Sequence, residues 1–306
     1  MAKAMLRLFG RPTSSNTQKV LWTLAELSSR TSFELVLASA RLGPDSDLLC
    51  EGTGAKPYGV VDSDEYVELC PTRLVPCLVD GSLSVWESHS IVRYLAQKYG
   101  PDLHLGSIEG MAQCSPWMDW LLFQNFHECN HDFIDQIART PPPERKLELM
   151  ARSYEGYVKR LQKVEEQVAR TGAFITGSSF SIADIVIGAE ISRFSCGMHR
   201  WAMGPQELPS LVELPHLCKY FRCLQGKLSM KAACSMRDNI RSWSPWPLER
   251  CKSCSPSEER TSSSRSVAGD LWLCRHGKSP QEFVFPFCEG PFEPLTDIVP
   301  RVGCRI

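Results

Sequence analysis

The clearest structural signal in this chain is the sequence Val75-Pro76-Cys77-Leu78-Val79-Asp80-Gly81, followed three residues later by Val85-Trp86-Glu87-Ser88-His89-Ser90-Ile91. A proline opens a short apolar strand, and the Asp-Gly turn sends the chain back as a second strand. A carboxylate and a hydroxyl follow where that strand gives way to a helix. Backbone amides before the proline and at the helix N-terminus, next to an acid, predict a site for a peptide-like ligand with a free amine and a free carboxylate.

The residues before this segment predict a strand, a helix and another strand. Residues 6–9 form the first strand, and a turn then leads to Ser14, Ser15 and Asn16, which are good helix N-cap residues. Apolar residues recur after them at helical spacing. Residues 33–37 form the next predicted strand. This β-α-β order normally gives a parallel strand pair with a right-handed crossover.

Residues 41–64 interrupt this unit. Glycine and proline punctuate them without clear periodicity, and so long a loop is uncommon inside a compact domain. We expect an insertion or loop that is either disordered, which we prefer, or a mobile flap near the site. The hairpin and a helix over residues 88–99 then complete a small four-stranded unit, so the first predicted domain spans residues 1–100.

Helical patterns dominate the chain after a linker that begins at Gly100. A long amphipathic helix is predicted over residues 144–170, and another helix opens at Phe180-Ser181-Ile182-Ala183-Asp184, which has the spacing of a capping box. We therefore expect an all-helical second domain over residues 105–238. Residues 239–306 hold eight prolines and ten serines without a sustained period, and we expect them to form a poorly ordered tail.

Composition is that of an ordinary soluble protein. The 306 residues predict about two domains, and a net charge of −1 argues against nucleic acid as a partner. There is no apolar run of about 18 residues, so we expect no membrane span. The opening residues lack the apolar core of a signal peptide, so the 14 cysteines are expected to be mostly reduced thiols in a cytoplasmic protein.

Three cysteines and a histidine near the end of the chain are the candidates for a metal site. Cys251, Cys254, Cys274 and His276 are spaced in a way that fits no common zinc module well. We expect no metal.

An α/β unit with a proline before its third strand, followed by an all-helical domain, resembles the glutathione transferase superfamily, in particular its serine-type and bacterial-type cytosolic members. The motifs that carry the resemblance are Ser14-Ser15-Asn16-Thr17-Gln18-Lys19-Val20-Leu21-Trp22, Leu74-Val75-Pro76, Trp86-Glu87-Ser88-His89-Ser90-Ile91-Val92-Arg93-Tyr94-Leu95 and Phe180-Ser181-Ile182-Ala183-Asp184. The resemblance covers about residues 5–237, apart from 41–55. It implies an α/β plus all-α fold, with an N-terminal thioredoxin-like domain followed by an all-helical C-terminal domain.

The resemblance also implies how glutathione is held as co-substrate, with no other cofactor. Val75, joined to Pro76 by a cis peptide bond, would present its backbone to the cysteinyl part of the tripeptide. Glu87 would pair with the γ-glutamyl ammonium, and Ser88 would bind the γ-glutamyl carboxylate at a helix N-terminus. Arg73 either reaches the glycyl carboxylate or is a solvated charge.

The glutathione thiol needs a hydrogen-bond donor, because a free cysteine thiol has a pKa of about 8.5. Either Ser14 or Ser15 matches the donor of the family, with Ser14 preferred, or both serines only cap the helix. The bacterial-type pattern adds Asn16 as a second donor. Tyrosine and cysteine are absent from this turn.

The helical domain is expected to supply the walls of a pocket for a small hydrophobic electrophile. Trp117, Trp120, Phe123 and His127 are the candidates, although an aromatic stripe at this spacing is more often core packing.

Transfer to electrophiles is the preferred activity. Glutathione-dependent reduction of disulfides or peroxides and a non-catalytic glutathione-binding module are the alternatives. The resemblance further implies a homodimer.

Overall fold

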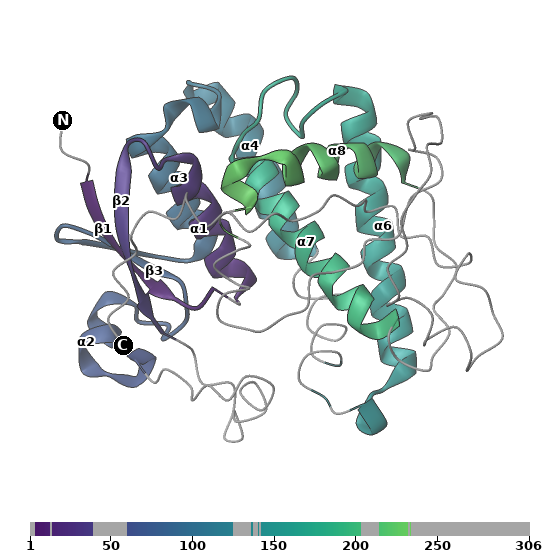
Figure 1. The fold of residues 1–306 in the computed structure, drawn as a ribbon, viewed down its shortest axis with the longest axis horizontal. Helices are drawn as coiled ribbons and strands as arrows, with labels where there is room; N and C mark the ends of the chain where they lie inside the picture. Colours follow the sequence, from purple (N-terminus) through teal and green to yellow (C-terminus); the bar gives the residue numbers. More distant parts are fainter. Residues whose placement is uncertain are drawn as a thin grey trace, which may run out of the picture.

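The computed structural model describes residues 4–12, 14–38, 60–124, 136, 140, 142–202, 214–231 and 233. Within these ranges a small sheet with its helices forms one half of the molecule, and helices alone form the other half (Figure 1). This is the predicted combination of a thioredoxin-like unit and a helical unit. No helix in the described ranges has the length and apolar character needed to span a bilayer.

The sheet has four strands in the order β2-β1-β3-β4. The first strand, β1 (Ala4–Gly10), pairs in parallel with β2 (Thr31–Leu37) and antiparallel with β3 (Cys77–Asp80). The edge strand β4 (Leu83–Trp86) returns from β3 across the predicted turn. Helix α1 (Ser15–Glu26) connects the parallel pair, so the predicted β-α-β opening is confirmed.

Side chains of β1 point alternately to the two faces of the sheet, and both faces are buried. Leu6 and Leu8 belong to the large core that includes side chains of α1 and α3 (Ser88–Tyr99). Phe9 belongs to a second, smaller cluster, where its ring meets Tyr66 edge-on at a centroid distance of 5.5 Å. Because neighbouring strand residues point to opposite faces, one short strand supports both clusters.

Helix α2 (Asp64–Leu69) was not predicted from the sequence. It covers the second face of the sheet and follows the 3₁₀ turn η2 (Val60–Asp62), so the end of the expected loop contains regular structure. The reason is local, since Ser63 Oγ accepts a hydrogen bond from the Tyr66 amide at 3.3 Å and two acids occupy the first turn. Residues 41–59, the rest of the expected insertion, lie outside the described residues.

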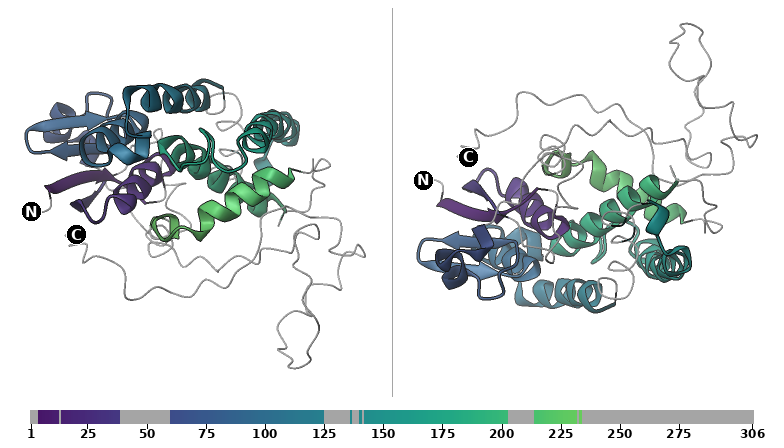
Figure 2. Two further views of the ribbon diagram at one scale, coloured as in Figure 1. Left: turned by 90° about the horizontal axis from the view of Figure 1, so that it is seen from above. Right: turned by 90° about the horizontal axis from the view of Figure 1, so that it is seen from below.

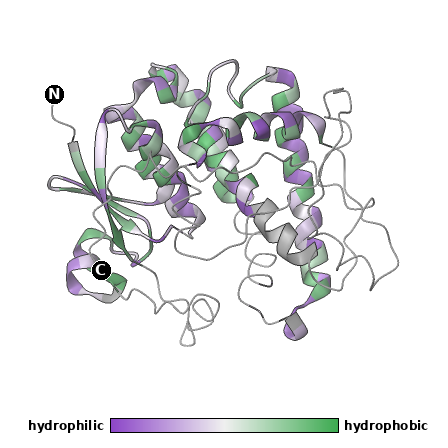
Figure 3. Cartoon of the chain, viewed as in Figure 1, coloured by the Kyte–Doolittle hydropathy of each residue, from purple (hydrophilic) through white to green (hydrophobic). Residues whose placement is uncertain are grey.

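The second half contains the predicted helices. The linker forms a 3₁₀ turn, η3 (Pro101–His104), and another such turn, η5 (Pro142–Glu144), precedes the longest helix. The α-helices are α4 (Ile108–Trp120), α6 (Leu147–Thr171), α7 (Ile182–Ala202) and α8 (Pro215–Gly226). Hydrophilic and hydrophobic residues both occur along α6 and α8, as in amphipathic helices (Figure 3). The predicted tail, 239–306, lies outside the described residues.

The predicted capping box at the start of α7 is present. The Asp184 carboxylate accepts hydrogen bonds from the Ser181 and Ile175 amides, both at 2.8 Å, and from the Tyr220 hydroxyl at 3.0 Å. This one buried carboxylate therefore joins α7 to the preceding turn and to α8, which fixes the position of the helix that faces the sheet domain.

The two halves pack together through α1 and α7. Gly188 of α7 lies so close to the Trp22 ring that an added Cβ would meet it at 2.9 Å, so this crossing requires glycine. Both views in Figure 2 place α1 between the sheet and the C-terminal helices. The start of α1 is thus held between the two halves of the chain, where we expect the site.

Candidate functional site

A cavity of about 260 Å³ lies where the start of α1, the segment before β3 and the start of α3 converge. It brings together the predicted residues Asn16, Val75, Pro76, Glu87 and Ser88. The other residues that line it are Cys70, Thr72 and Leu74. Three chain segments that are far apart in sequence therefore enclose one small space, as the sequence motifs predicted.

The cis peptide bond expected between Val75 and Pro76 is present. The segment before it is held by its backbone, because the Leu74 carbonyl accepts hydrogen bonds from the Tyr66 hydroxyl at 2.6 Å and the Cys70 thiol at 3.4 Å. Arg73 has a φ of 53° and an exposed side chain that does not line the cavity. Arg73 is therefore not among the residues that the cavity brings together.

The turn into α3 places an acid and a helix N-terminus beside each other. Glu87 has a φ of 67°, which non-glycine residues rarely adopt and which is found most often at functional sites. No side chain caps α3, so the amides of its first turn have no capping acceptor. Ser88 is buried at this end and lines the cavity. An anion would be stabilised here and a cation would be stabilised by Glu87.

The first residues of α1 have different partners. Ser14 is the N-cap, and its hydroxyl oxygen accepts from the Thr17 amide at 3.4 Å. Ser15 is buried, and its hydroxyl accepts a hydrogen bond from the Arg193 guanidinium of α7. Neither serine lines the cavity, whereas Asn16 does.

A buried charge cluster lies behind this turn and was not predicted. The Lys19 side chain is 0% exposed, and Glu190 of α7 is 2% exposed. Glu190 accepts a hydrogen bond from the Tyr157 hydroxyl at 3.0 Å, and its second carboxylate oxygen has no hydrogen-bond partner among the described residues. Lys19 directly precedes Val20, Leu21 and Trp22 in the sequence, but nothing in α1 alone indicates that its charge is buried.

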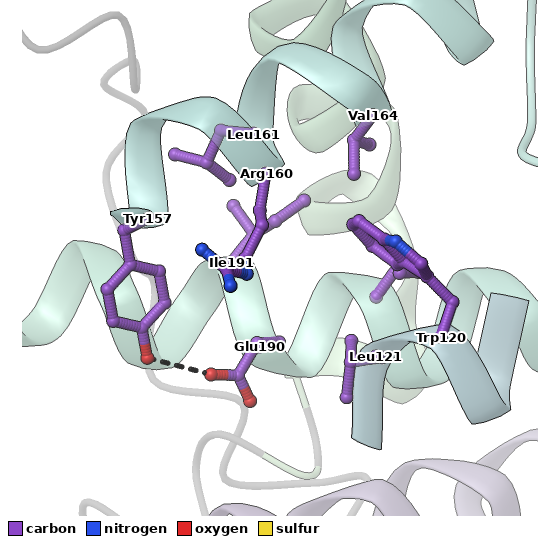
Figure 4. Close-up of a pocket in the computed structure, with 9 residues that line it drawn as sticks. Trp120, Leu121, Tyr157, Arg160, Leu161, Val164, Glu190 and Ile191 are labelled. Carbon is purple, nitrogen blue, oxygen red and sulfur yellow. Dashed lines mark hydrogen bonds between the residues drawn. The ribbon is translucent and has the colours of Figure 1, made fainter. Parts of the chain in front are cut away.

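A second cavity, of about 270 Å³, lies within the helical half (Figure 4). Trp120 of α4 forms one wall, and Tyr157, Arg160 and Glu190 contribute polar groups. The other lining residues are Leu121, Leu161, Val164, Ile187 and Ile191. The lining of this cavity is mainly apolar.

The four predicted pocket walls have different surroundings. Trp120 lines the second cavity, and the Trp117 ring packs edge-on against the Trp120 ring at a centroid distance of 5.6 Å. Phe123 is 75% exposed and lines neither cavity. His127 lies outside the described residues.

Cys77, the residue after Pro76, is not an activated thiol. Burial, followed by the neighbouring Cys70 thiol, raises the pKa of Cys77 to about 12, so it is a thiol at neutral pH. Among the described residues no three His, Cys, Asp or Glu side chains form a group that could hold a metal ion. Cys251, Cys254, Cys274 and His276 lie outside the described residues.

Comparison with known sequences finds relatives that share these features. Residues 8–102 match the family described as "Glutathione S-transferase, N-terminal domain". Glutathione S-transferase GstB of Escherichia coli K12 is 31% identical over 205 residues, which cover 66% of this chain and 88% of that protein. Glutathione S-transferase 3 of Zea mays is 29% identical over 189 residues, which cover 59% of this chain and 74% of that protein.

Structure comparison agrees with the sequence. The theta class glutathione S-transferase of Xanthomonas axonopodis pv. citri, in a crystal structure with glutathione bound, superposes with a TM-score of 0.59 at 27% identity. The match covers 75% of this chain and 97% of that one. Since the fold, the order of the motifs and an alignment over most of a curated relative all agree, this chain belongs to the glutathione S-transferase family.

Proposed function

We propose that the protein binds glutathione in the 260 Å³ cavity, ionises its thiol and transfers the thiolate to small hydrophobic electrophiles. The observation that carries this proposal is the convergence of Asn16, the Val75–Pro76 segment and the Glu87–Ser88 turn on one space. These three elements offer complements to the sulfur, the cysteinyl backbone and the γ-glutamyl end of a single extended tripeptide.

The γ-glutamyl end of glutathione is assigned to the start of α3. Its carboxylate would accept hydrogen bonds from the Ser88 hydroxyl and the uncapped amides of the first turn, where the helix dipole favours an anion. Its ammonium would pair with the Glu87 carboxylate, which lines the same cavity. The positive φ of Glu87 supports this assignment, because such backbone geometry is retained mainly where function requires it.

The sulfur is assigned to the start of α1. Lowering the pKa of the thiol by two units requires about 2.7 kcal/mol of preferential interaction with the thiolate. Asn16 can donate from its amide, and Ser14 can donate its hydroxyl hydrogen, because only its oxygen is engaged by the Thr17 amide. Ser15 is a weaker candidate, since it is buried and already bonded to Arg193.

The electrophile is assigned to the space on the helical side of the sulfur. The apolar side chains around Trp120 are the part of the helical half to which we assign a small hydrophobic substrate. In a substitution, the thiolate forms a carbon–sulfur bond while the leaving group departs with the electron pair of its own bond to that carbon. In an addition, the thiolate forms a bond to one carbon of an activated double bond, and the π electron pair moves to the activating group and is protonated. The chemistry requires no metal or second cofactor.

Assembly and location are also proposed. We infer a homodimer in the cytoplasm, and exposed apolar side chains around the outer strand support a covered surface there. Leu83 and Trp86 of β4 are 46% and 39% exposed, and Leu74 is 50% exposed.

The direct test is calorimetric titration with reduced glutathione, followed by assays with chlorodinitrobenzene and with a mixed disulfide of glutathione. We expect binding and conjugation from the wild type, and conjugation faster than disulfide reduction. Glu87→Ala should weaken binding, whereas Glu68→Ala, an exposed acid on α2 away from the cavity, should not. Equal loss in both variants, or reduction alone, would contradict the proposed transferase function.

A further inference from the structure

The buried lysine of α1 contacts the residue to which we assign the sulfur. Lys19 lies one helical turn after Asn16, and its ammonium donates a hydrogen bond to Asn16 Oδ1 at 3.1 Å. Lys19 is fully buried, while Asn16 is partly exposed and lines the glutathione cavity. A buried lysine is rare unless a paired group compensates its burial, so its placement here requires a reason.

The chemistry of the two side chains fixes the orientation of the amide. A lysine ammonium has donors only, whereas an asparagine amide has an acceptor oxygen at one side and a donor NH₂ at the other. The Asn16 oxygen must therefore face Lys19, and the NH₂ must face away from it. Without the lysine the amide could turn over and present its oxygen, which would repel a thiolate.

The charges around Lys19 come from other parts of the fold. Glu190 and Arg193 lie on α7, and Glu87 lies in the turn before α3. His89, in the first turn of α3, is neutral, because burial and then the charges of Lys19 and Arg93 lower its pKa well below the usual value. Burial lowers the pKa of Lys19 to about 8; Glu190 and Glu87 act against this shift and Arg193 adds to it. The ammonium is thus only moderately favoured at neutral pH, and an additional anion nearby would favour it further.

We propose that Lys19 is a positioning residue, which holds the Asn16 amide so that Nδ2 donates to the glutathione sulfur and whose charge favours the thiolate. The inference rests on the proposed function, since it requires glutathione in the cavity. The thiol proton leaves to water, and Lys19 remains an ammonium throughout. Lys19 acts through Asn16 and need not touch the substrate.

Variants of the pair test whether they act together. The readout is the pKa of bound glutathione, followed by the ultraviolet band of the thiolate as pH is raised. Lys19→Met should raise this pKa and reduce the thiolate at pH 7 about tenfold, and Asn16→Ala should do the same. The double variant should shift the thiol pKa by less than the sum of the two single variants, because both changes remove the same donor. Lys19→Arg should restore most of the effect.

Two controls separate positioning from general damage. S-methylglutathione has no thiol, so its affinity should be the same in wild type and Lys19→Met. Lys163→Met, at an exposed lysine of α6, should leave the thiol pKa unchanged. A further measurement uses the wild type alone, with its lysines labelled at Cε and titrated by NMR. The Lys19 pKa should be higher with glutathione bound than with S-methylglutathione bound.

Several results would overturn the proposal. They are an unchanged thiol pKa in Lys19→Met, an equal loss of affinity for both ligands, or a Lys19 titration that does not distinguish them. If the wild type forms the thiolate but any of these results is found, the proposed role of Lys19 is rejected and the proposed function stands. If wild type neither binds glutathione nor shows a thiolate band, the proposed function fails with it.

Discussion

Arg193, in the helical half of the molecule, donates a hydrogen bond to the hydroxyl of Ser15, in the first turn of α1. The two residues are 178 positions apart in the sequence. The contact therefore ties the assigned thiol site to the second half of the chain. It also distinguishes the two serines, since Ser15 is engaged in this contact while Ser14 keeps a hydroxyl hydrogen free for a ligand.

Ser14→Ala should lower the rate of conjugation at pH 7 tenfold or more, because the thiolate loses a donor. Glutathione affinity should change little, since most contacts lie at Val75 and α3. Steady-state kinetics with calorimetry would measure both. Ser14→Thr, which retains the hydroxyl, should recover most of the rate. If Ser15→Ala rather than Ser14→Ala gave this pattern, the donor would be Ser15.

Glu87→Gln should weaken glutathione binding about tenfold, because a neutral amide replaces the partner of the γ-glutamyl ammonium. A glutathione analogue that lacks this amine provides a matched control. Wild type and Glu87→Gln should bind the analogue with equal affinity, as measured by calorimetry. If Glu87→Gln weakened binding of the analogue as much as binding of glutathione, Glu87 would not form an ion pair with the γ-glutamyl ammonium.

Asp184→Ala should destabilise the fold by about 3–5 kcal/mol, since it leaves buried amides and the Tyr220 hydroxyl without their acceptor. Asp184→Asn keeps one acceptor oxygen and should cost less. Urea denaturation would measure both changes. A cost below about 1 kcal/mol for the alanine variant would mean that the capping network contributes little.

The turn of the β3–β4 hairpin should contribute a pH-dependent part of the stability. Burial disfavours ionisation of Asp80, but hydrogen bonds from Lys98, Tyr99 and Tyr94 outweigh burial and hold the pKa of its carboxyl below the usual value. The folded state thus binds this proton less readily than the unfolded state. The stabilisation is complete above the unfolded pKa of about 3.9 and is lost as pH falls through the folded value.

The free energies of unfolding of wild type and Asp80→Asn should therefore differ at pH 7 and converge in acid. Exposed Glu68→Gln on α2 serves as the control and should show no such difference. A gap between wild type and Asp80→Asn that stayed constant from neutral pH down to about pH 2 would contradict this explanation.

Local signals in the sequence predicted much of the fold and part of the site. The Asp-Gly turn, the proline before β3 and the Ser181–Asp184 spacing each act within a few residues, and all are found in the structure. The cavity accordingly contains the predicted residues Val75, Pro76, Glu87 and Ser88. Helix α2 was missed because one short capped turn carries no periodicity that differs from a loop.

Contacts between distant segments could not be predicted. Lys19 and Glu190 lie on helices from different halves, and nothing in either helix alone indicates that a charge is buried there. The Arg193–Ser15 contact depends on the same packing, which is set by Gly188 against Trp22. The environment of the predicted thiol donors was therefore visible only in three dimensions.

The central claim is that this protein ionises the thiol of bound glutathione at neutral pH. Ultraviolet titration of the wild-type complex measures it directly. The account predicts a thiolate band that is half developed about two pH units below the value of about 8.5 for a free thiol. A band that appeared only with the pKa of free glutathione, although the tripeptide was bound, would contradict it.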